Sequence, residues 1–309
     1  MAKNLVVILG PTASGKTEVA AKLAGDLQGE IISADSRQVY RGMDIGTGKD
    51  LNQYIIDARK IPYHMIDIVD PESEFNLFEF QKRFYQIFSQ ISNNGNLPIL
   101  VGGTGLYLQA VLSGYKMPEA TPEPALRNEL DQKSIEELKK IFFAFKTQLH
   151  NKTDLEDKQR LIRAIEIERA RNILNSKQEE RPAIDAAVFG ISWERSVLRQ
   201  RITLRLEERL QHGMIEEVKS LHAAGLSWSR LDSFGLEYRY LSQYLQNLIS
   251  FDEMKNKLNT AIHQFAKRQE TWFRRMERKG ITIKWIQANE YELLKESIIN
   301  TKLLSKNNL

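Results

Sequence analysis

Short apolar runs alternate with amphipathic stretches in the first third of the chain. The runs at residues 5–9, 30–34 and 98–101 contain β-branched side chains, which is typical of strands buried inside a parallel sheet. After each run, apolar side chains recur at helical spacing, and these stretches are residues 18–27, 75–91 and 106–112. The alternation predicts an α/β fold in which helices cover both faces of a parallel sheet.

The pattern changes after residue 118. Three prolines punctuate the chain between residues 118 and 124, and residues 125–176 then carry helical patterns without a strand. A further strand is predicted at residues 187–192. Long amphipathic helices and a last strand follow it, at residues 194–212, 214–224, 252–278 and 281–286. We therefore expect one discontinuous α/β core, residues 1–118 and 182–309, interrupted by a helical insertion at residues 119–181.

A phosphate-binding loop is predicted between the first strand and the first helix. Residues 10–17 fit the pattern G-x-x-x-x-G-K-[ST], in which backbone N–H groups surround an anion at the start of a helix. In this pattern Lys16 holds a phosphate and the hydroxyl of Thr17 is a ligand for Mg²⁺. The candidate phosphate ligands are Gly10, Pro11, Thr12, Ala13, Ser14, Gly15, Lys16 and Thr17. The loop predicts a polyphosphate ligand, but it does not specify ATP.

Other polar residues follow the predicted strands or face the same edge of the sheet. Asp35 ends the second strand, where it is either a general base or a turn aspartate. Thr104 lies in a Gly-Gly-Thr-Gly turn, and Arg201 and Arg205 share one helix face. Because ligands bind at the carboxyl ends of parallel strands, these residues should converge with the loop on one crevice. A cation such as Arg205 would neutralise charge on a departing phosphate group there.

The amino-acid composition excludes functions that depend on cysteine. The 309 residues contain no cysteine, which excludes disulfides, thiolate metal sites and cysteine nucleophiles. No apolar run approaches the roughly 20 residues that cross a bilayer, and the first strand begins too early for a signal peptide, so we expect a cytoplasmic protein. The formal net charge is +4, but residues 262–284 hold seven basic and two acidic side chains. That segment is either a phosphate-facing surface or a solvated helix face.

A carboxylate at the end of a strand, which ATPases use for Mg²⁺, is missing after residues 98–101, where glycines follow instead. The segment His64-Met65-Ile66-Asp67 is a possible substitute. This absence lowers the expectation of an ATPase.

Taken together, the ordered motifs resemble the tRNA dimethylallyltransferase (isopentenyltransferase) family. They extend from Val6 to about Arg275 and include residues 10–17, 33–40, 42–47, 102–107, 159–166, 201–205 and 266–274. The phosphate loop is common to many NTPases, whereas the segments Asp-Ser-x-Gln-Val-Tyr, Gly-Gly-Thr and Ala-Lys-Arg-Gln-x-Thr-Trp are far more specific in this order. The chain departs from the family pattern at residues 235–238 and 262–264, and it lacks an Asp-Pro segment at residues 141–151.

The resemblance implies a P-loop NTPase-like core that transfers a dimethylallyl group from dimethylallyl diphosphate to tRNA. The acceptor is N6 of the adenosine immediately 3′ of the anticodon, with Asp35 as the general base. Lys16, Thr17 (through Mg²⁺), Thr104 and Arg205 would surround the diphosphate. The implied partners are the anticodon stem-loop of tRNA and the prenyl donor, without a membrane, and the protein is expected to be a monomer. The implied tRNA contacts are Asp35, Ser36, Arg37, Gln38, Thr104, Arg127, Gln159, Arg160, Leu161, Ile162 and Arg163.

Other functions remain open from the residues alone. In a P-loop kinase of a small metabolite, Asp35 would activate a hydroxyl and Arg205 would act on a γ-phosphate, with no need for RNA. A non-catalytic RNA-binding protein would not depend on Asp35. A prenyltransferase of free adenine nucleotide would have no use for a long helical insertion.

Overall fold

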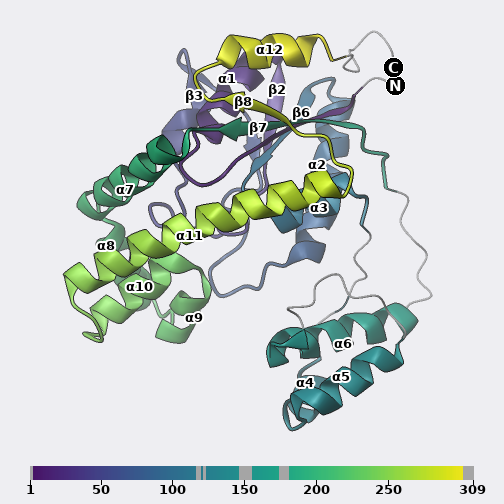
Figure 1. Ribbon diagram of the computed structural model, residues 1–309, viewed down its shortest axis with the longest axis vertical. Coiled ribbons are helices and arrows are strands. Elements are labelled where there is room, and N and C mark those ends of the chain that lie inside the picture. Colours follow the sequence, from purple (N-terminus) through teal and green to yellow (C-terminus); the bar gives the residue numbers. More distant parts are fainter. Residues whose placement is uncertain (1–2, 116–119, 121–122, 146–154, 174–180, 302–309) are drawn as a thin grey trace. The chain divides into compact units, whose positions relative to one another are not determined.

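The computed structural model describes residues 3–115, 120, 123–145, 155–173 and 181–301 (Figure 1). The chain divides into two compact units, one formed by Met1–Tyr115 with Pro182–Leu309 and the other by Lys116–Arg181. The larger unit is the α/β core and contains the phosphate loop. The smaller unit consists of helices in its described residues.

The core contains a six-stranded sheet in the order β5-β2-β6-β1-β7-β8, and every neighbouring pair is parallel. The strands are β1 (Leu5–Leu9), β2 (Gly29–Ser33), β5 (Tyr63–His64), β6 (Leu97–Gly102), β7 (Ala186–Ser192) and β8 (Lys284–Gln287). Val6 of β1 is in register with Ile99 of β6 and with Ala187 of β7. The phosphate loop therefore leaves the sheet between two flanking strands, at the centre of its carboxyl edge.

Helices cover both faces of the sheet, which explains why its strands are continuous apolar runs. On one face, α1 (Lys16–Leu27) and α12 (Tyr291–Ile299) share a core with side chains of β1, β6 and β7. On the other, α2 (Leu77–Asn93) lies against β6, and its Phe80 ring stacks on Tyr107 of α3 (Gly105–Leu112) with the ring centres 4.1 Å apart. Figure 1 shows α1 and α12 on one side of the sheet, opposite α2 and α3.

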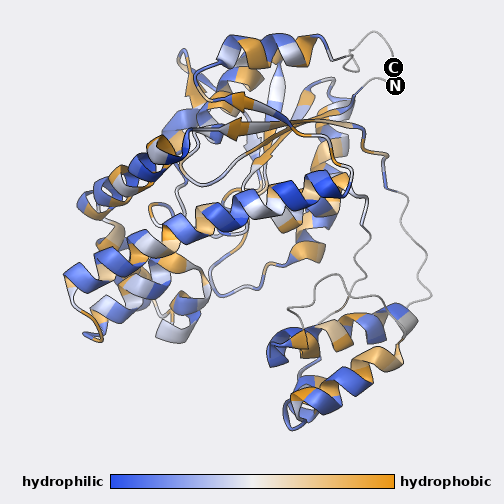
Figure 2. Cartoon of the chain, in the orientation of Figure 1, coloured by the Kyte–Doolittle hydropathy of each residue, from blue (hydrophilic) through white to orange (hydrophobic). Residues whose placement is uncertain are grey.

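A second group of helices packs beside the carboxyl edge of the sheet. It contains α7 (Arg195–Gln211), α8 (Met214–Ala223), α9 (Trp228–Ser233), α10 (Leu236–Leu245) and α11 (Phe251–Arg278). Their buried side chains form one cluster with Val39, Tyr40 and Met43, which follow β2. This cluster fixes α7 and α11 against the loops of the sheet. Figure 2 shows that α11 carries long hydrophilic stretches on the side in view.

The segment between β2 and β5 contains little regular structure. It includes a short 3₁₀ helix, η1 (Leu51–Tyr54), and a small antiparallel pair of β3 (Ile55–Ile56) and β4 (Arg59–Lys60). Tyr54 is buried in the core beneath α1. Because η1 follows directly after residues 44–50, it fixes one end of a loop that lines the site described below.

The smaller unit has its own hydrophobic core. It is built from α4 (Pro124–Asp131), α5 (Ile135–Ala144) and α6 (Lys158–Ile173). Leu161 and Ile162 of α6 are 0% and 1% exposed and pack among leucines and a phenylalanine from α4 and α5. The side chains of Leu161 and Ile162 thus form part of the core of this unit, and contacts of these two residues with tRNA stay predictions.

The predicted elements of the α/β core are confirmed, with small shifts at their ends. The last strand begins at Lys284, not at residue 281, and α1 begins at Lys16, directly after the loop. Helices α9 and α10 were not predicted, because residues 228–245 combine short helices with closely spaced aromatic side chains. Among the described residues, none of the helices has the length and apolar character needed to cross a bilayer.

Candidate active site

The phosphate loop has the backbone geometry of an anion cradle. Gly15 has φ 82° and Ala13 has φ 62°, so the chain turns through the left-handed region twice before α1 begins. Two carbonyl oxygens of the loop are bonded away from its centre: Ala13 O accepts from Arg201 Nε at 2.9 Å, and Ser14 O accepts from Trp193 Nε1 at 2.9 Å. With these carbonyls fixed, the later amide groups of the loop can converge on an anion at the helix N-terminus.

Gly10 and Ser14 explain the tight start of this loop. A Cβ atom on Gly10 would lie 2.7 Å from Ser14 Oγ and 3.0 Å from the carbonyl oxygen of Ile191. Only glycine fits this approach without a shift of backbone. Ser14 Oγ is buried and has no hydrogen-bond partner among the described residues, so it is available to an oxygen ligand in the cradle.

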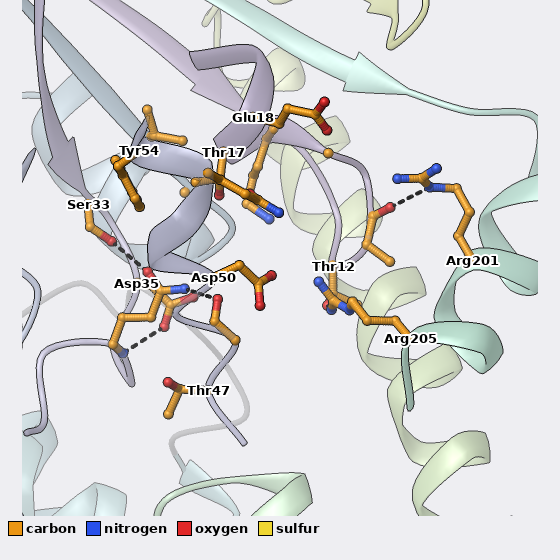
Figure 3. Close-up of a pocket in the computed structure, with 18 of the residues that line it drawn as sticks. Thr12, Thr17, Glu18, Ser33, Asp35, Thr47, Asp50, Tyr54, Arg201 and Arg205 are labelled. Atoms are coloured by element: carbon orange, nitrogen blue, oxygen red, sulfur yellow. Dashed lines mark hydrogen bonds between the residues drawn. The ribbon is translucent and has the colours of Figure 1, made fainter. Parts of the chain in front are cut away.

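A pocket of about 310 Å³ opens beside the loop. It is lined by residues after β1, at the end of β2 and after it, by the last two residues of β6, by the loop before η1 and η1 itself, and by one face of α7. The prediction that the polar residues converge with the phosphate loop on one crevice is confirmed for Asp35, Arg201 and Arg205, which line this pocket together with Lys16. It is not confirmed for Thr104, which is not among the lining residues. In Figure 3, Arg201 and Arg205 lie on one side, and Ser33, Asp35 and Tyr54 lie on the other.

Lys16 and Arg205 bring positive charges close together in the pocket. Burial and the neighbouring Arg205 lower the pKa of Lys16 to about 8, although Asp35 acts in the opposite direction. Burial and Arg209 also lower the pKa of Arg205, which as a guanidinium remains charged at neutral pH. Arg205 Nη2 donates to Thr12 Oγ1 in the loop. These cations repel each other in the ligand-free protein, and a polyanion between them would relieve that repulsion.

Asp35 stabilises a turn with one carboxylate oxygen and leaves the other oxygen open for a role as general base. Its Oδ1 accepts from the backbone N–H groups of Arg37 at 2.8 Å and Gln38 at 3.4 Å, as in an Asx turn. Among the described residues, its Oδ2 accepts no hydrogen bond. One carboxylate oxygen thus fixes the turn, and the other is available to a substrate in the pocket.

Thr104 and Gln38 already have partners within the protein. Thr104 Oγ1 accepts from Ser36 N–H at 3.2 Å, and Thr104 is not among the residues that line the described pocket. The carboxamide of Gln38 donates from Nε2 to Gly48 O at 3.0 Å and accepts from Ser33 Oγ at 3.2 Å. The contacts of Thr104 with diphosphate and of Gln38 with a base stay predictions, and each would require an additional or exchanged hydrogen bond.

A loop that sequence reasoning did not assign to the site forms part of its wall. Thr47, Gly48 and Asp50 line the pocket. The carboxylate of Glu217 on α8 accepts from the backbone N–H groups of three consecutive residues of this loop, at 2.7, 2.6 and 3.0 Å, and from Tyr238 OH at 2.7 Å. Residues 42–47 belong to the motifs of the family resemblance, but the loop shows no periodic pattern and its anchor lies more than 170 residues away, so its place in the site was not predicted.

The suggested substitute carboxylate for Mg²⁺ after residue 64 has a different role. Asp67 is paired with the buried Lys49, which also donates to Tyr40 O and, at 2.9 Å, to Asp44 Oδ1. The pocket instead receives a carboxylate from Asp50. The suggestion that His64-Met65-Ile66-Asp67 supplies a carboxylate to the site is therefore wrong, because Asp67 neutralises a buried cation.

Two of the departures from the family pattern fall on α10 and α11 of the core. Glu237, the first acidic residue of α10, lines a small cavity of about 10 Å³ with Arg205 and Arg209. Burial raises the pKa of Glu237, whereas the two arginines act to lower it. At residues 262–264, His263 lies within 3.3 Å of the hydroxyl of Thr203. Most of the departure at residues 141–151 lies outside the described residues.

The predicted tRNA-contacting arginines of the smaller unit are partly used to hold that unit together. Glu166 is 1% exposed, and its carboxylate accepts from Arg127 Nε at 2.8 Å and from Arg163 Nη1 at 2.9 Å. Burial acts to raise the pKa of Glu166, but these hydrogen bonds outweigh it and hold the pKa below its usual range. Gln159 and Arg160 lie on the exposed surface, next to Asp131 and Asp157 respectively. Contacts of these four residues with tRNA remain predictions.

A basic surface is present on α11. Lys267, Arg268, Arg274 and Arg278 are exposed, and Arg275 stacks over the ring of Trp272 at 5.6 Å. Glu270 lies 3.9 Å from Arg274 and offsets one of these charges only weakly. The segment is therefore an amphipathic helix whose buried side packs on the core and whose exposed side is mainly cationic.

The chain matches two family models. One, described as IPP transferase, matches residues 38–276, and another, described as isopentenyl transferase, matches residues 3–70. The chain belongs to the IPP transferase family. The resemblance drawn from the motifs is thereby confirmed.

Similar proteins and structures agree with this family. The chain is 57% identical to "tRNA dimethylallyltransferase 1" of Syntrophus aciditrophicus, over 96% of this chain and 98% of that protein. It is 54% identical to "tRNA dimethylallyltransferase 2" of Trichlorobacter lovleyi, over 92% of each. The structure of the full-length tRNA isopentenylpyrophosphate transferase of Bacillus halodurans has a TM-score of 0.69 and 30% identity, covering 97% of this chain and 96% of that one.

A eukaryotic dimethylallyltransferase acting on tRNA has a TM-score of 0.76 at 22% identity, covering 99% of this chain and 81% of that chain, and supports the fold alone. These structures agree with the P-loop NTPase-like core that the sequence predicts. The chain is therefore a transferase of this family.

Proposed function

We propose that this protein transfers a dimethylallyl group from dimethylallyl diphosphate to N6 of the adenosine immediately 3′ of the anticodon in tRNA, with release of diphosphate. The observation that carries the proposal is the content of one pocket: a glycine-rich anion cradle with Lys16 and Arg205, and an oxygen of Asp35 that has no hydrogen-bond partner among the described residues. The names of its relatives support the same reaction.

The cationic side of the pocket acts on the leaving group. As the allylic C–O bond breaks, negative charge grows on the diphosphate oxygens, and interactions that strengthen with this charge lower the barrier. Lys16 and Arg205 are suited to this role because both are positioned before the reaction, Lys16 by the loop and Arg205 by its hydrogen bond to Thr12. Their burial strengthens the attraction, since less solvent screens it.

The acidic side of the pocket acts on the nucleobase. N6 forms a bond to the allylic carbon and loses a proton, which Asp35 Oδ2 accepts. General-base catalysis of this kind contributes about 10²–10⁴-fold in rate. The adenosine reaches the pocket only when it is unstacked from the anticodon loop, which costs a few kcal/mol. Single-stranded loops are the parts of RNA whose bases are accessible in this way.

Mg²⁺ fits the oxygen-rich lining of the pocket. Thr17 and Asp50 offer a hydroxyl and a carboxylate, and the described residues contain no cluster of three histidine, cysteine or acidic side chains. That donor set suits Mg²⁺, which keeps several waters and binds through one or two protein oxygens together with substrate phosphates. Thr17 and Asp50 would hold the ion. When bound, it supplies additional positive charge to the diphosphate.

The two basic regions are proposed to hold the RNA. The exposed cations of α11 would contact phosphates, and the smaller helical unit would contact the anticodon stem-loop. Contacts with phosphates make affinity fall as salt concentration rises. We further propose that the protein acts in the cytoplasm as a monomer.

The test is to incubate the protein with an unmodified tRNA transcript and dimethylallyl diphosphate, and to analyse nuclease digests by mass spectrometry. A five-carbon mass gain is expected on the adenosine next to the anticodon, and none on a transcript with guanosine at that position. Asp35→Asn keeps the Oδ1 turn bonds, so it should reduce transfer by about 10²–10⁴-fold with tRNA affinity nearly unchanged. Asp252→Asn, on the exposed first turn of α11, is the matched control.

Near-normal turnover by Asp35→Asn would contradict the assigned base. Consumption of ATP in the absence of RNA, without any prenyl transfer, would favour a small-metabolite kinase instead.

A further inference from the structure

Gln269 joins two loops that belong to different halves of the site. It lies on the buried side of α11 and is 7% exposed. Its Oε1 accepts from the backbone N–H of Thr12 at 2.8 Å, and its Nε2 donates to the carbonyl oxygen of Gly103 at 2.9 Å. One carboxamide therefore bridges the phosphate loop after β1 and the glycine-rich turn after β6.

Each of the two bridged loops is also hydrogen-bonded to a residue at or next to the reaction site. Toward the leaving group, the hydroxyl of Thr12 accepts from Arg205. Toward the nucleobase, the residue after Gly103 is Thr104, whose hydroxyl accepts from the backbone N–H of Ser36, next to Asp35. Gln269 itself does not line the described pocket. Its effect on substrates must act through the loops that it connects.

Two glycines of the turn, Gly103 and Gly105, leave the space that side chains of α11 occupy. A Cβ atom on Gly103 would overlap Gln269 Nε2, and one on Gly105 would overlap the indole of Trp272. Neither glycine has a positive φ. Glycine is therefore needed at these positions because a side chain would not fit, not because of the backbone conformation. The turn is thus built to receive the Gln269 carboxamide and the ring that follows it on α11.

We propose that Gln269 is a positioning residue for prenyl transfer, and this rests on the function proposed above. It fixes the separation between the loop that holds the diphosphate and the turn that supports the Asp35 segment. Because Gln269 already accepts the Thr12 N–H, the anion is held by later amides of the loop and by Lys16. The carboxamide thereby sets where the donor lies relative to the general base.

The first test compares two variants that differ in which hydrogen bond they remove. Gln269→Met keeps a similar volume and removes both bonds. Gln269→Glu keeps an acceptor for Thr12 N–H but cannot donate to Gly103 O when ionised. We expect kcat to fall by about tenfold to a hundredfold in both, as for small misplacements of reacting groups. The KM for the donor and the Kd for tRNA should change by less than about threefold.

The matched control is Asn256→Leu, which replaces an exposed carboxamide on the same helix by an apolar group of similar size. It should leave kcat unchanged. A merely structural role of Gln269 would lower the thermal unfolding temperature of its variants while leaving kcat of the folded protein within about twofold. That result would overturn the proposal.

A double-mutant cycle tests the bridge itself. The methyl group of Gly103→Ala would displace the carboxamide, so this variant should reproduce the kcat loss of Gln269→Ala. In the Gln269→Ala background the overlap with the carboxamide is gone and the nearest remaining contact is the carbonyl oxygen of Gly10 at 3.2 Å, so Gly103→Ala should add much less than it does in the unsubstituted protein. Independent, multiplicative losses would overturn the bridge. If a Gln269 variant does not fold, Gly103→Ala carries the test.

The proposed function and the positioning role fail in distinguishable ways. If the unsubstituted protein transfers no prenyl group, the proposed function is wrong and the positioning role falls with it. If the unsubstituted protein is active and the variants at residues 269 and 103 retain its kcat, only the positioning role is wrong.

Discussion

The lowered pKa of Lys16 makes diphosphate binding dependent on pH in a way that can be measured without tRNA. In the ligand-free protein, burial and Arg205 lower this pKa to about 8. A bound diphosphate favours the charged ammonium and raises the pKa again. Binding is therefore strongest below pH 8, where Lys16 is already protonated, and weakens as the pH rises through 8.

The magnitude follows from the fraction of charged Lys16. With a pKa of about 8, roughly nine-tenths of the lysine is charged at pH 7 and roughly one-tenth at pH 9, which predicts about tenfold weaker binding at pH 9, or about 1.4 kcal/mol. At pH 8, binding should take up about half a proton at this site. Isothermal titration calorimetry with inorganic diphosphate, in two buffers of different ionisation enthalpy, measures both quantities.

Lys16→Arg separates the protein's titration from that of the ligand. The guanidinium stays charged over this range, so the pH dependence that remains in the variant reports diphosphate itself. The difference between the unsubstituted protein and Lys16→Arg should be near tenfold between pH 7 and pH 9. Identical pH profiles for the two proteins, with no proton uptake at pH 8, would refute the conclusion that the pKa of Lys16 in the phosphate loop is lowered to about 8.

Three further predictions address the supports of the site and the RNA surfaces. Glu217→Ala should lower the free energy of unfolding by about 3 kcal/mol and raise the KM for the donor, because three backbone amides and Tyr238 lose their acceptor. Denaturant titration measures the first effect and initial-rate kinetics the second, and an unchanged KM would contradict the role of the loop in the pocket. Glu166→Ala should destabilise the smaller unit by about 3 kcal/mol, since it leaves two arginines without their buried partner; limited proteolysis should then cut first within residues 116–181, and unaltered protection would contradict it. Arg274→Glu with Arg275→Glu should weaken tRNA binding and reduce its salt dependence; filter-binding affinities that match the unsubstituted protein at every salt concentration would contradict the proposal that α11 contacts RNA.

The core strands and the phosphate loop could be predicted from the sequence because their signals are local. A strand that is covered on both faces needs apolar side chains throughout, so β1 and β6 are continuous apolar runs. The phosphate loop depends on spacing within eight residues, and Arg201 and Arg205 share a face because they are four apart on α7. Each of these features is decided by near neighbours in the chain.

The remaining parts of the site depend on distant contacts, and the motifs at residues 42–47 and 266–274 did not by themselves indicate what these segments hold in place. The loop that contributes Asp50 is held by Glu217, and the phosphate loop is held by Gln269, which lies 257 residues beyond Thr12. Leu161 and Ile162 lie in one of the family motifs and are also buried in the core of the smaller unit. A motif that resembles a family's RNA-contacting segment also contains the residues that fold that segment, and burial alone separates the two.

A crystal structure with an anticodon stem-loop and an unreactive analogue of the prenyl donor tests the central claim most directly. The account predicts the diphosphate within residues 10–17, in contact with Lys16 and Arg205, and the adenosine N6 within hydrogen-bond distance of Asp35 Oδ2. A nucleotide base turned away from Asp35, or a diphosphate bound outside the loop, would contradict it.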